Sequence, residues 1–175
     1  MKCILYFLFL ILISCQKDTS RVRPSPIPSQ SFRMSINGQE WQADSVEGFF
    51  FIRESFFLIV ASSAKRKVEI RFRAYAPTTL SLQNSAVNYV TVSLGDKFPL
   101  SPPSSKLSHE GDHVEYFVTQ HPEASGFLHL TQVFQDLVTG RFEFVGIALP
   151  SEGNVVHVPK IVVTQGAFHT RIVKK

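Results

Sequence analysis

The sequence predicts an all-β fold, an antiparallel β-sandwich or a partly open barrel, placed after a signal peptide and a Pro-rich tether. In VEIRFRAY (68–75) apolar and polar residues alternate, which is the period-two pattern of a half-buried strand. Other segments rich in β-branched and aromatic residues recur between Gly, Pro, Ser and Asn. Short strands at such intervals are typical of sandwiches and barrels.

The first part of the domain predicts two hairpins. FRMSINGQEWQA carries Asn37-Gly38, a pair that supplies the two positive-φ positions of a tight hairpin turn. GFFFIRESFFLIVAS reads as two strands that turn at Arg53, Glu54 and Ser55. Its nearly continuous Phe and Ile runs indicate strands with both faces buried, or one long hairpin inside a sandwich.

The second part predicts further strands in VNYVTVSL, HVEYFVT, RFEFVGIAL, VVHVPKIVVT and GAFHTRIV, with FPLSPPSSKLSHEGD as a long loop. Residues 126–138 are ambiguous, because Phe127, Leu130, Phe134 and Leu137 also fit a helical stripe. The strand is favoured, since the neighbouring segments are strand-like and a helix here lacks a good cap.

The amino terminus has the layout of an export signal. Lys2 precedes an apolar run, Ile4–Ile13, that is too short to span a bilayer, which takes about 20 residues. Leu12-Ile13-Ser14-Cys15 resembles the lipobox of bacterial lipoproteins, which implies cleavage before Cys15 and diacylglycerol on its sulfur. The alternative is an ordinary signal peptide with Cys15 near the cleavage region. Since Cys3 leaves with the signal, the mature chain would contain no internal disulfide.

The expected domains are a lipoprotein signal peptide (1–14), a lipidated cysteine with a Pro/Ser-rich tether (15–31), and one all-β domain (32–175). The alternating prolines of the tether favour an extended chain of up to roughly 50 Å. The expected location is the bacterial outer membrane, on its periplasmic face or at the cell surface. The expected partners are the membrane through the lipid, and a glycan or envelope protein.

The formal net charge is +4, and the densest basic cluster is AKRK (64–67). This cluster is interpreted as a solvated turn and strand face, with weak contacts to acidic lipid headgroups or polysaccharide as the alternative. No nucleic acid is expected, because the basic residues are not interleaved with stacking aromatics on one face.

The order of several elements resembles a group of small Bacteroidetes-type lipoproteins of unknown function. The shared elements are FRMSINGQEW with Asn37, Gly38 and Trp41, then TGRFEF, then VTQGAF. The segment PTTLSL (77–82) departs from the Gly-x-Tyr-x-Leu element of that group. The resemblance implies a β-rich exported lipoprotein and no catalytic residues. From the residues themselves, the glycines of these elements suit turns or bulges, and the aromatic residues suit packing.

The strongest metal candidate is SHEGDH, where His109, Glu110, Asp112 and His113 are suitable transition-metal ligands. The spacing is not that of HExxH on a helix, and a solvated loop is the favoured interpretation. A weaker candidate is a set of strand histidines, His129, His157 and His169, on one sheet face.

No catalytic motif stands out. The sequence lacks a Gly-x-Ser-x-Gly elbow, a phosphate loop, a dinucleotide fingerprint and a recognisable carboxylate pair for glycoside hydrolysis. We therefore expect no cofactor and no catalysis. An enzyme whose site is assembled from distant loops is the third alternative.

The weak candidates for ligand binding are Trp41, Tyr75 and Tyr116, because sugar recognition uses exposed aromatic platforms. For Trp41, a lid on the core is favoured over a platform. The expected function is that of a lipid-anchored, non-catalytic envelope protein that binds a ligand or partner or has a structural role. The alternative is a carbohydrate-binding accessory lipoprotein of an outer-membrane uptake system.

Overall fold

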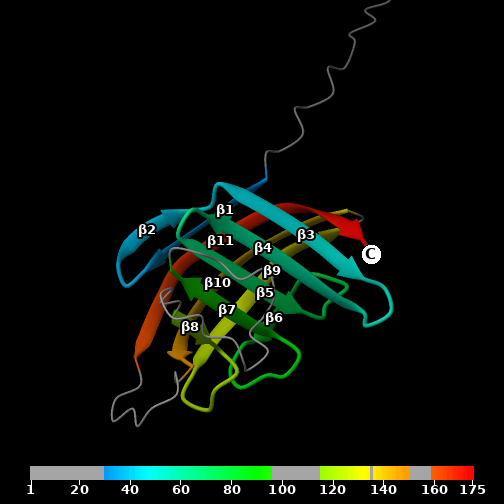
Figure 1. Cartoon of the computed structure of the whole chain (residues 1–175). Helices are drawn as coiled ribbons and strands as arrows, with labels where there is room; N and C mark the ends of the chain where they lie inside the picture. Colours follow the sequence, from blue (N-terminus) through cyan, green and yellow to red (C-terminus); the bar gives the residue numbers. More distant parts are fainter. Residues whose placement is uncertain (1–29, 96–114, 135, 150–158) are drawn as a thin grey trace, which may run out of the picture.

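The computed structural model describes residues 30–95, 115–134, 136–149 and 159–175, and these contain strands and no helix. The all-β prediction is therefore confirmed. The strands in chain order (Figure 1) are β1 (Ser31–Ile36), β2 (Gln39–Gln42), β3 (Ser45–Phe51), β4 (Phe56–Ser63), β5 (Arg66–Phe72), β6 (Thr78–Ser81), β7 (Tyr89–Leu94), β8 (Glu115–Val118), β9 (Ser125–Phe134), β10 (Leu137–Ala148) and β11 (Lys160–Lys174).

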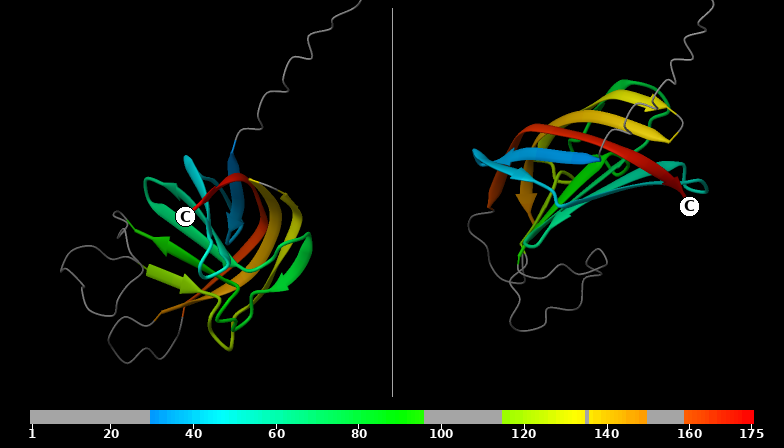
Figure 2. Two further views of the ribbon diagram at one scale, coloured as in Figure 1. Left: turned by 90° about the vertical axis from the view of Figure 1, so that its right-hand side faces the viewer. Right: turned by 90° about the horizontal axis from the view of Figure 1, so that it is seen from above.

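The strands form one 11-stranded sheet in the order β2-β1-β11-β3-β4-β5-β7-β8-β10-β9-β6, with an additional β11–β10 pairing. That pairing folds the sheet on itself. β2, β1, β11, β10, β9 and β6 make a first half, and β3, β4, β5, β7 and β8 make a second half. Figure 2 shows the two halves curving round a shared interior, as in a sandwich that is partly closed into a barrel.

The sheet is mixed, with a parallel pair among its antiparallel ones. The carboxyl end of β11 pairs with β3 in parallel, with Ile172 opposite Gly48. A Cβ built on Gly48 would lie 2.5 Å from the Arg171 carbonyl oxygen, so only glycine permits this close junction. The parallel pair joins the first half of the sheet to the second.

The predicted Asn37-Gly38 hairpin is confirmed. Its two residues have φ values of 50° and 82°, and Ile36 pairs with Gln39 across the turn. The turn is also bound to β11, because the Asn37 N–H donates to the Val162 carbonyl at 2.8 Å. In return, the Val162 N–H donates to Asn37 Oδ1 at 2.8 Å. Asn37 therefore fixes both the hairpin and its place on the sheet.

The strand interpretation of 126–138 is confirmed, since this segment lies in β9 and β10. The two segments predicted at the carboxyl end differ from the structure, because 160–174 is one continuous strand, β11. Gln165 has a φ of 54° and sits at a shift of register against both neighbouring strands. A bulge at this position lets one long strand bend where the sequence suggests an interruption.

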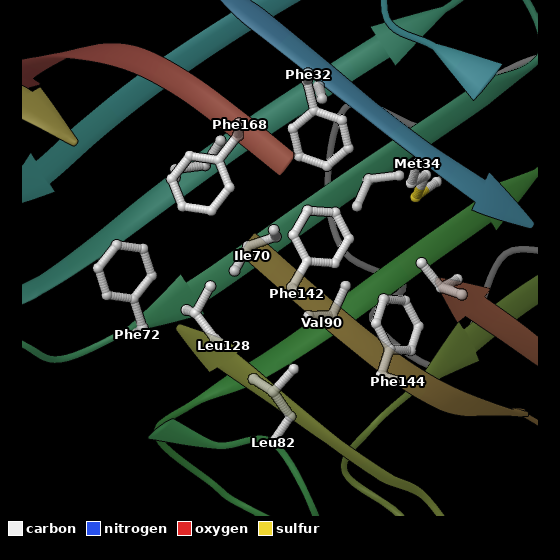
Figure 3. Packing of buried hydrophobic residues seen from close by; sticks show 14 of the residues in the cluster. Phe32, Met34, Ile70, Phe72, Leu82, Val90, Leu128, Phe142, Phe144 and Phe168 are labelled. Carbon is white, nitrogen blue, oxygen red and sulfur yellow. The ribbon is translucent and has the colours of Figure 1, made fainter. Parts of the chain in front are cut away.

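The core lies between the two halves and contains aromatic side chains from both (Figure 3). Its most characteristic contact joins β10 to β11, where Gly140 pairs with Phe168 and Phe142 pairs with Gly166. A Cβ on Gly166 would lie 2.5 Å from Phe142 Cε2, and one on Gly140 would lie 2.7 Å from Phe168 Cζ. Each glycine thus leaves space for the phenylalanine of the other strand. We call these four residues the Gly–Phe seam.

Candidate functional site

The outward side of the same strands carries a shallow depression of about 670 Å³. It extends over β1, β11, β10 and the adjoining parts of β2 and β9. The residues that line it are Ser31, Phe32, Arg33, Gln42, Thr131, Thr139, Gly140, Arg141, Ala167, Phe168 and His169. Phe32, Gly140 and Phe168 point inward and belong to the core. We call the outward-pointing residues of this depression the arginine face, because two arginines dominate its chemistry; they are Ser31, Arg33, Gln42, Thr131, Thr139, Arg141, Ala167 and His169.

The two arginines lie in one cross-strand row. Arg33 pairs with Ala167, and Ala167 pairs with Arg141 on its other side. Neighbouring strands are about 4.8 Å apart, so the two arginine backbones lie roughly 10 Å from each other. The methyl group of Ala167 is the only side chain between them in the row, so the surface is hollow between the two arginines.

Strand alternation explains why arginine occurs beside the core. Arg141 lies between Gly140 and Phe142 in the sequence, and Ala167 lies between Gly166 and Phe168. Successive side chains point to opposite faces of a strand. The Gly–Phe seam therefore points inward, while Arg141 and Ala167 point outward into the depression.

Both guanidinium groups are available for an external anion. Arg33 and Arg141 are exposed, and neither forms an ion pair with another described residue. A guanidinium presents a planar fork of donors that binds carboxylate, sulfate or phosphate oxygens in a bidentate manner. Two such forks on either side of a low floor are suited to an extended ligand with repeated oxyanion groups.

Hydrogen bonds hold the polar wall beside this row. Thr139 Oγ1 lies 2.8 Å from His169 Nδ1, and the Thr131 hydroxyl donates to the Thr139 carbonyl at 3.2 Å. His169 Nε2 is buried and has no hydrogen-bond partner among the described residues. Beyond Arg141, the row continues to His129, whose Nδ1 lies 2.7 Å from Thr79 Oγ1.

A smaller depression of about 460 Å³ adjoins the arginine face and shares Arg33 and Gln42 with it. Trp41 lines this depression but is only 9% exposed. Its Nε1–H donates to Ser63 Oγ at 3.0 Å, and its ring meets the Phe32 ring edge-on at 5.8 Å. Trp41 therefore packs as a lid on the core, as favoured from the sequence.

The two predicted tyrosines lie elsewhere. Tyr75 is 67% exposed in the turn after β5, and its hydroxyl donates to the Ser55 carbonyl at 3.4 Å. Tyr116 lies on β8 opposite Ser93. Burial, and secondarily the Glu69 charge, raise the pKa of the Tyr116 phenol. Trp41, Tyr75 and Tyr116 occupy separate parts of the surface and form no common platform.

Several predicted site residues lie outside the described part of the chain, namely Cys15, His109, Glu110, Asp112, His113 and His157. Within the described residues, no group of three or more His, Cys, Asp and Glu side chains is placed to hold a metal. His129 and His169 each contact a different threonine. The same described residues include no helix long and apolar enough to cross a membrane.

Arg33 and Arg141 were not singled out from the sequence. The sequence feature that points to them is the position of each arginine between inward-facing residues. Arg33 lies between Phe32 and Met34, and Arg141 lies between Gly140 and Phe142. Which strands are neighbours decides whether two such arginines meet, and strand order was not deducible from the pattern.

The family model of a domain of unknown function, DUF6252, matches residues 28–170. The chain belongs to the DUF6252 family. No curated protein and no solved structure matches it. The expected resemblance to a family of unknown function is confirmed in this form. The DUF6252 match includes every residue of the arginine face and of the Gly–Phe seam.

Proposed function

We propose that this protein is a lipid-anchored, non-catalytic protein of the bacterial outer membrane that binds an anionic ligand on its arginine face. The signal-like amino terminus and the lipobox-like sequence before Cys15 support the anchor. Two or three acyl chains suffice for stable membrane attachment. The folded domain then acts as a binding module held near the membrane by the tether.

The observation that carries the binding proposal is the placement of Arg33 and Arg141 on either side of Ala167. Buried or paired arginines are structural, but these two are exposed and unpaired among the described residues. A ligand with oxyanion groups would gain charge-assisted hydrogen bonds from both guanidinium groups.

A second candidate is a carbohydrate-binding accessory lipoprotein of an outer-membrane uptake system. It is favoured by the polar groups that line the arginine face besides the arginines, namely Ser31, Gln42, Thr131 and Thr139. Hydroxyl and amide groups both donate and accept hydrogen bonds, so they match the hydroxyls of a sugar chain. An acidic polysaccharide would satisfy both candidates, and a neutral one only the second.

Polygalacturonate and its fully methyl-esterified form test the binding proposal, because they share a backbone and differ in carboxylate charge. We expect saturable binding of the acid form and at least tenfold weaker binding of the ester. Hydrogen bonds to charged groups contribute about 1.5–3 kcal/mol each, so Arg33→Gln/Arg141→Gln should weaken binding by about 100-fold or more. Arg53→Gln, at an exposed position in the turn between β3 and β4, is the control and should bind normally.

The outcomes separate the two candidates. Equal binding of acid and ester, unaffected by the arginine variant, would overturn anion recognition and leave the neutral carbohydrate module. Binding of neither polymer would overturn both ligand proposals. If Arg33→Gln/Arg141→Gln bound the acid form with full affinity, the arginine face would not be the binding site, even if the protein preferred the acid form to the ester.

The anchor is tested separately by membrane fractionation of cells that express the native protein or Cys15→Ser. We expect the native protein in the membrane fraction and loss of lipid incorporation in the variant. Protease treatment of intact cells then distinguishes the cell surface from the periplasmic face. Lipid-free native protein would contradict the anchor and leave the binding proposal standing.

A further inference from the structure

The four most exposed of the large apolar side chains in the described residues lie at one end of the domain. They are Ile52 (58% exposed), Tyr75 (67%), Phe134 (62%) and Val173 (56%). They come from the β3–β4 turn, the turn after β5, the β9–β10 hairpin and the end of β11. Figures 1 and 2 show the chain's carboxyl terminus, the β3–β4 turn and the β9–β10 hairpin at the same end. We call this end the apolar rim.

Backbone hydrogen bonds make the rim one connected surface. The Ile52 N–H donates to the Lys175 carbonyl at 3.2 Å, which joins the β3–β4 turn to the end of β11. The Ile172 N–H donates to the Asp136 carbonyl at 2.6 Å, which joins β11 to the β9–β10 hairpin. Scattered exposed apolar residues are ordinary, whereas a cluster on adjoining segments marks a contact surface.

The rim is also basic. The basic side chains on its segments are Arg53, Arg73, Arg171, Lys174 and Lys175. The acidic side chains on the same segments are Glu54 and Asp136. Lys175 Nζ lies 4.8 Å above the Phe49 ring, and the Arg73 guanidinium donates to the Glu54 carbonyl at 2.7 Å. Positive groups thus surround apolar ones, which is the chemistry of a surface that meets anionic lipid headgroups.

The chain enters the domain at this end. The Thr170 hydroxyl donates to Gln30 Oε1 at 3.2 Å, only a few residues before the end of β11. Gln30 is the first described residue. Between it and Cys15 the tether can extend at most roughly 50 Å. A lipid on Cys15 would therefore keep the apolar rim close to the bilayer at a high effective concentration.

We propose that the apolar rim docks on a membrane surface of anionic phospholipid headgroups, so that the arginine face at the side of the barrel is held in a fixed orientation. This inference rests on the lipid anchor proposed above. Apolar side chains enter the headgroup region, and the surrounding Lys and Arg contact lipid phosphates.

The test uses the full lipidated chain in phosphatidylglycerol vesicles that contain a headgroup-labelled quencher lipid. A fluorophore is attached to Val173→Cys or, as matched control, to Val162→Cys. Both are exposed valines of β11, 56% and 47% respectively. They are separated by about 35 Å along the strand. Ile52→Cys is a second reporter, in case Val173→Cys disturbs folding.

We expect quenching at positions 173 and 52 to exceed that at 162 by about threefold or more, and to fall in phosphatidylcholine vesicles. Each basic residue strengthens adsorption to an anionic surface by about fivefold. Lys174→Gln/Lys175→Gln should therefore bring quenching at 52 close to that at 162, as should high salt. Equal quenching at all three positions in phosphatidylglycerol vesicles would overturn the docking proposal.

A chain without lipid on Cys15 would give a different result from a lipidated chain whose apolar rim does not dock. If Cys15 is acylated and Cys3 removed, the native chain contains no free thiol and takes up no fluorophore. Labelling of the native chain would contradict the anchor. Vesicle-bound native chain without labelling, combined with equal quenching at 162 and 173, would contradict only the docking.

Discussion

The inward and outward sides of β10 and β11 differ in chemistry although their residues alternate along the same two strands. Inward, the Gly–Phe seam fits each phenylalanine into the space that the opposite glycine leaves. Outward, Arg141 and Ala167 lie on the arginine face beside Arg33. The glycine and phenylalanine positions of these strands therefore specify the fold, and the positions between them carry the candidate site.

The largest expected effect is on the inward side. Phe142→Ala removes a fully buried ring that contacts Phe32 at 5.3 Å and Phe168 at 6.3 Å between centroids. We expect the free energy of unfolding to fall by about 3–5 kcal/mol, as for other buried Phe→Ala substitutions. Chemical denaturation measures it. A loss below 1 kcal/mol would show that the seam is not tightly packed.

Gly166→Ala tests the seam by adding atoms. The new Cβ would lie 2.5 Å from Phe142 Cε2 and 2.6 Å from the Phe142 carbonyl oxygen. Because part of the clash is with backbone, we expect a loss of about 1–3 kcal/mol in the free energy of unfolding. Ala167→Ser, one residue away on the outward side, is the control and should change it by less than about 0.5 kcal/mol. Equal effects at 166 and 167 would contradict the division between the two sides.

Trp41→Phe should cost less than either seam variant. It keeps an aromatic ring against Phe32 but removes the hydrogen bond from Nε1–H to Ser63. We expect a loss of about 1 kcal/mol, the typical contribution of one such bond. Thermal unfolding measures it, and polygalacturonate binding should stay unchanged. Loss of binding with normal stability would instead make Trp41 a platform.

Substitutions on the outward side should hardly change the free energy of unfolding. Arg33→Gln/Arg141→Gln is expected to change the free energy of unfolding by less than about 0.5 kcal/mol, because both side chains are exposed and unpaired within the described structure. A large loss would mean that the arginines are structural and would explain any binding defect by unfolding.

The smallest effect concerns an exposed ion pair between Glu123 and Lys160, at the start of β11 and away from both the Gly–Phe seam and the arginine face. A hydrogen bond from Lys160, at 2.9 Å, and its charge lower the pKa of the exposed Glu123 carboxyl. A lowered folded-state pKa contributes stability above the unfolded value and loses it as pH falls through the folded value. Lys160→Met should therefore return the Glu123 titration, followed by NMR, towards its ordinary range. Because solvent screens the pair, we expect only a small change in the free energy of unfolding. If Glu123 titrated identically in Lys160→Met and in the native protein, the ion pair would not form in solution.

Sequence patterns predicted the elements of this fold better than their arrangement. Alternation in VEIRFRAY and the Asn37-Gly38 turn depend on neighbouring residues only, and both features are present. The parallel β3–β11 pair and the meeting of Arg33 with Arg141 across Ala167 depend on contacts between distant segments. Hence the sequence points to aromatic residues as binding candidates, whereas Trp41 packs against the core and the candidate site proposed here contains two arginines.

The most direct measurement is an NMR titration of the protein with oligogalacturonate, following backbone amides on both halves of the sheet. We predict saturable shifts at Arg33, Thr139, Arg141 and Ala167, with the outward residues of β4 and β5 unchanged. The same shifts should be absent with the methyl ester. Shifts confined to the second half of the sheet, or none at saturating ligand, would contradict the assignment of binding to the outward positions of β1, β10 and β11.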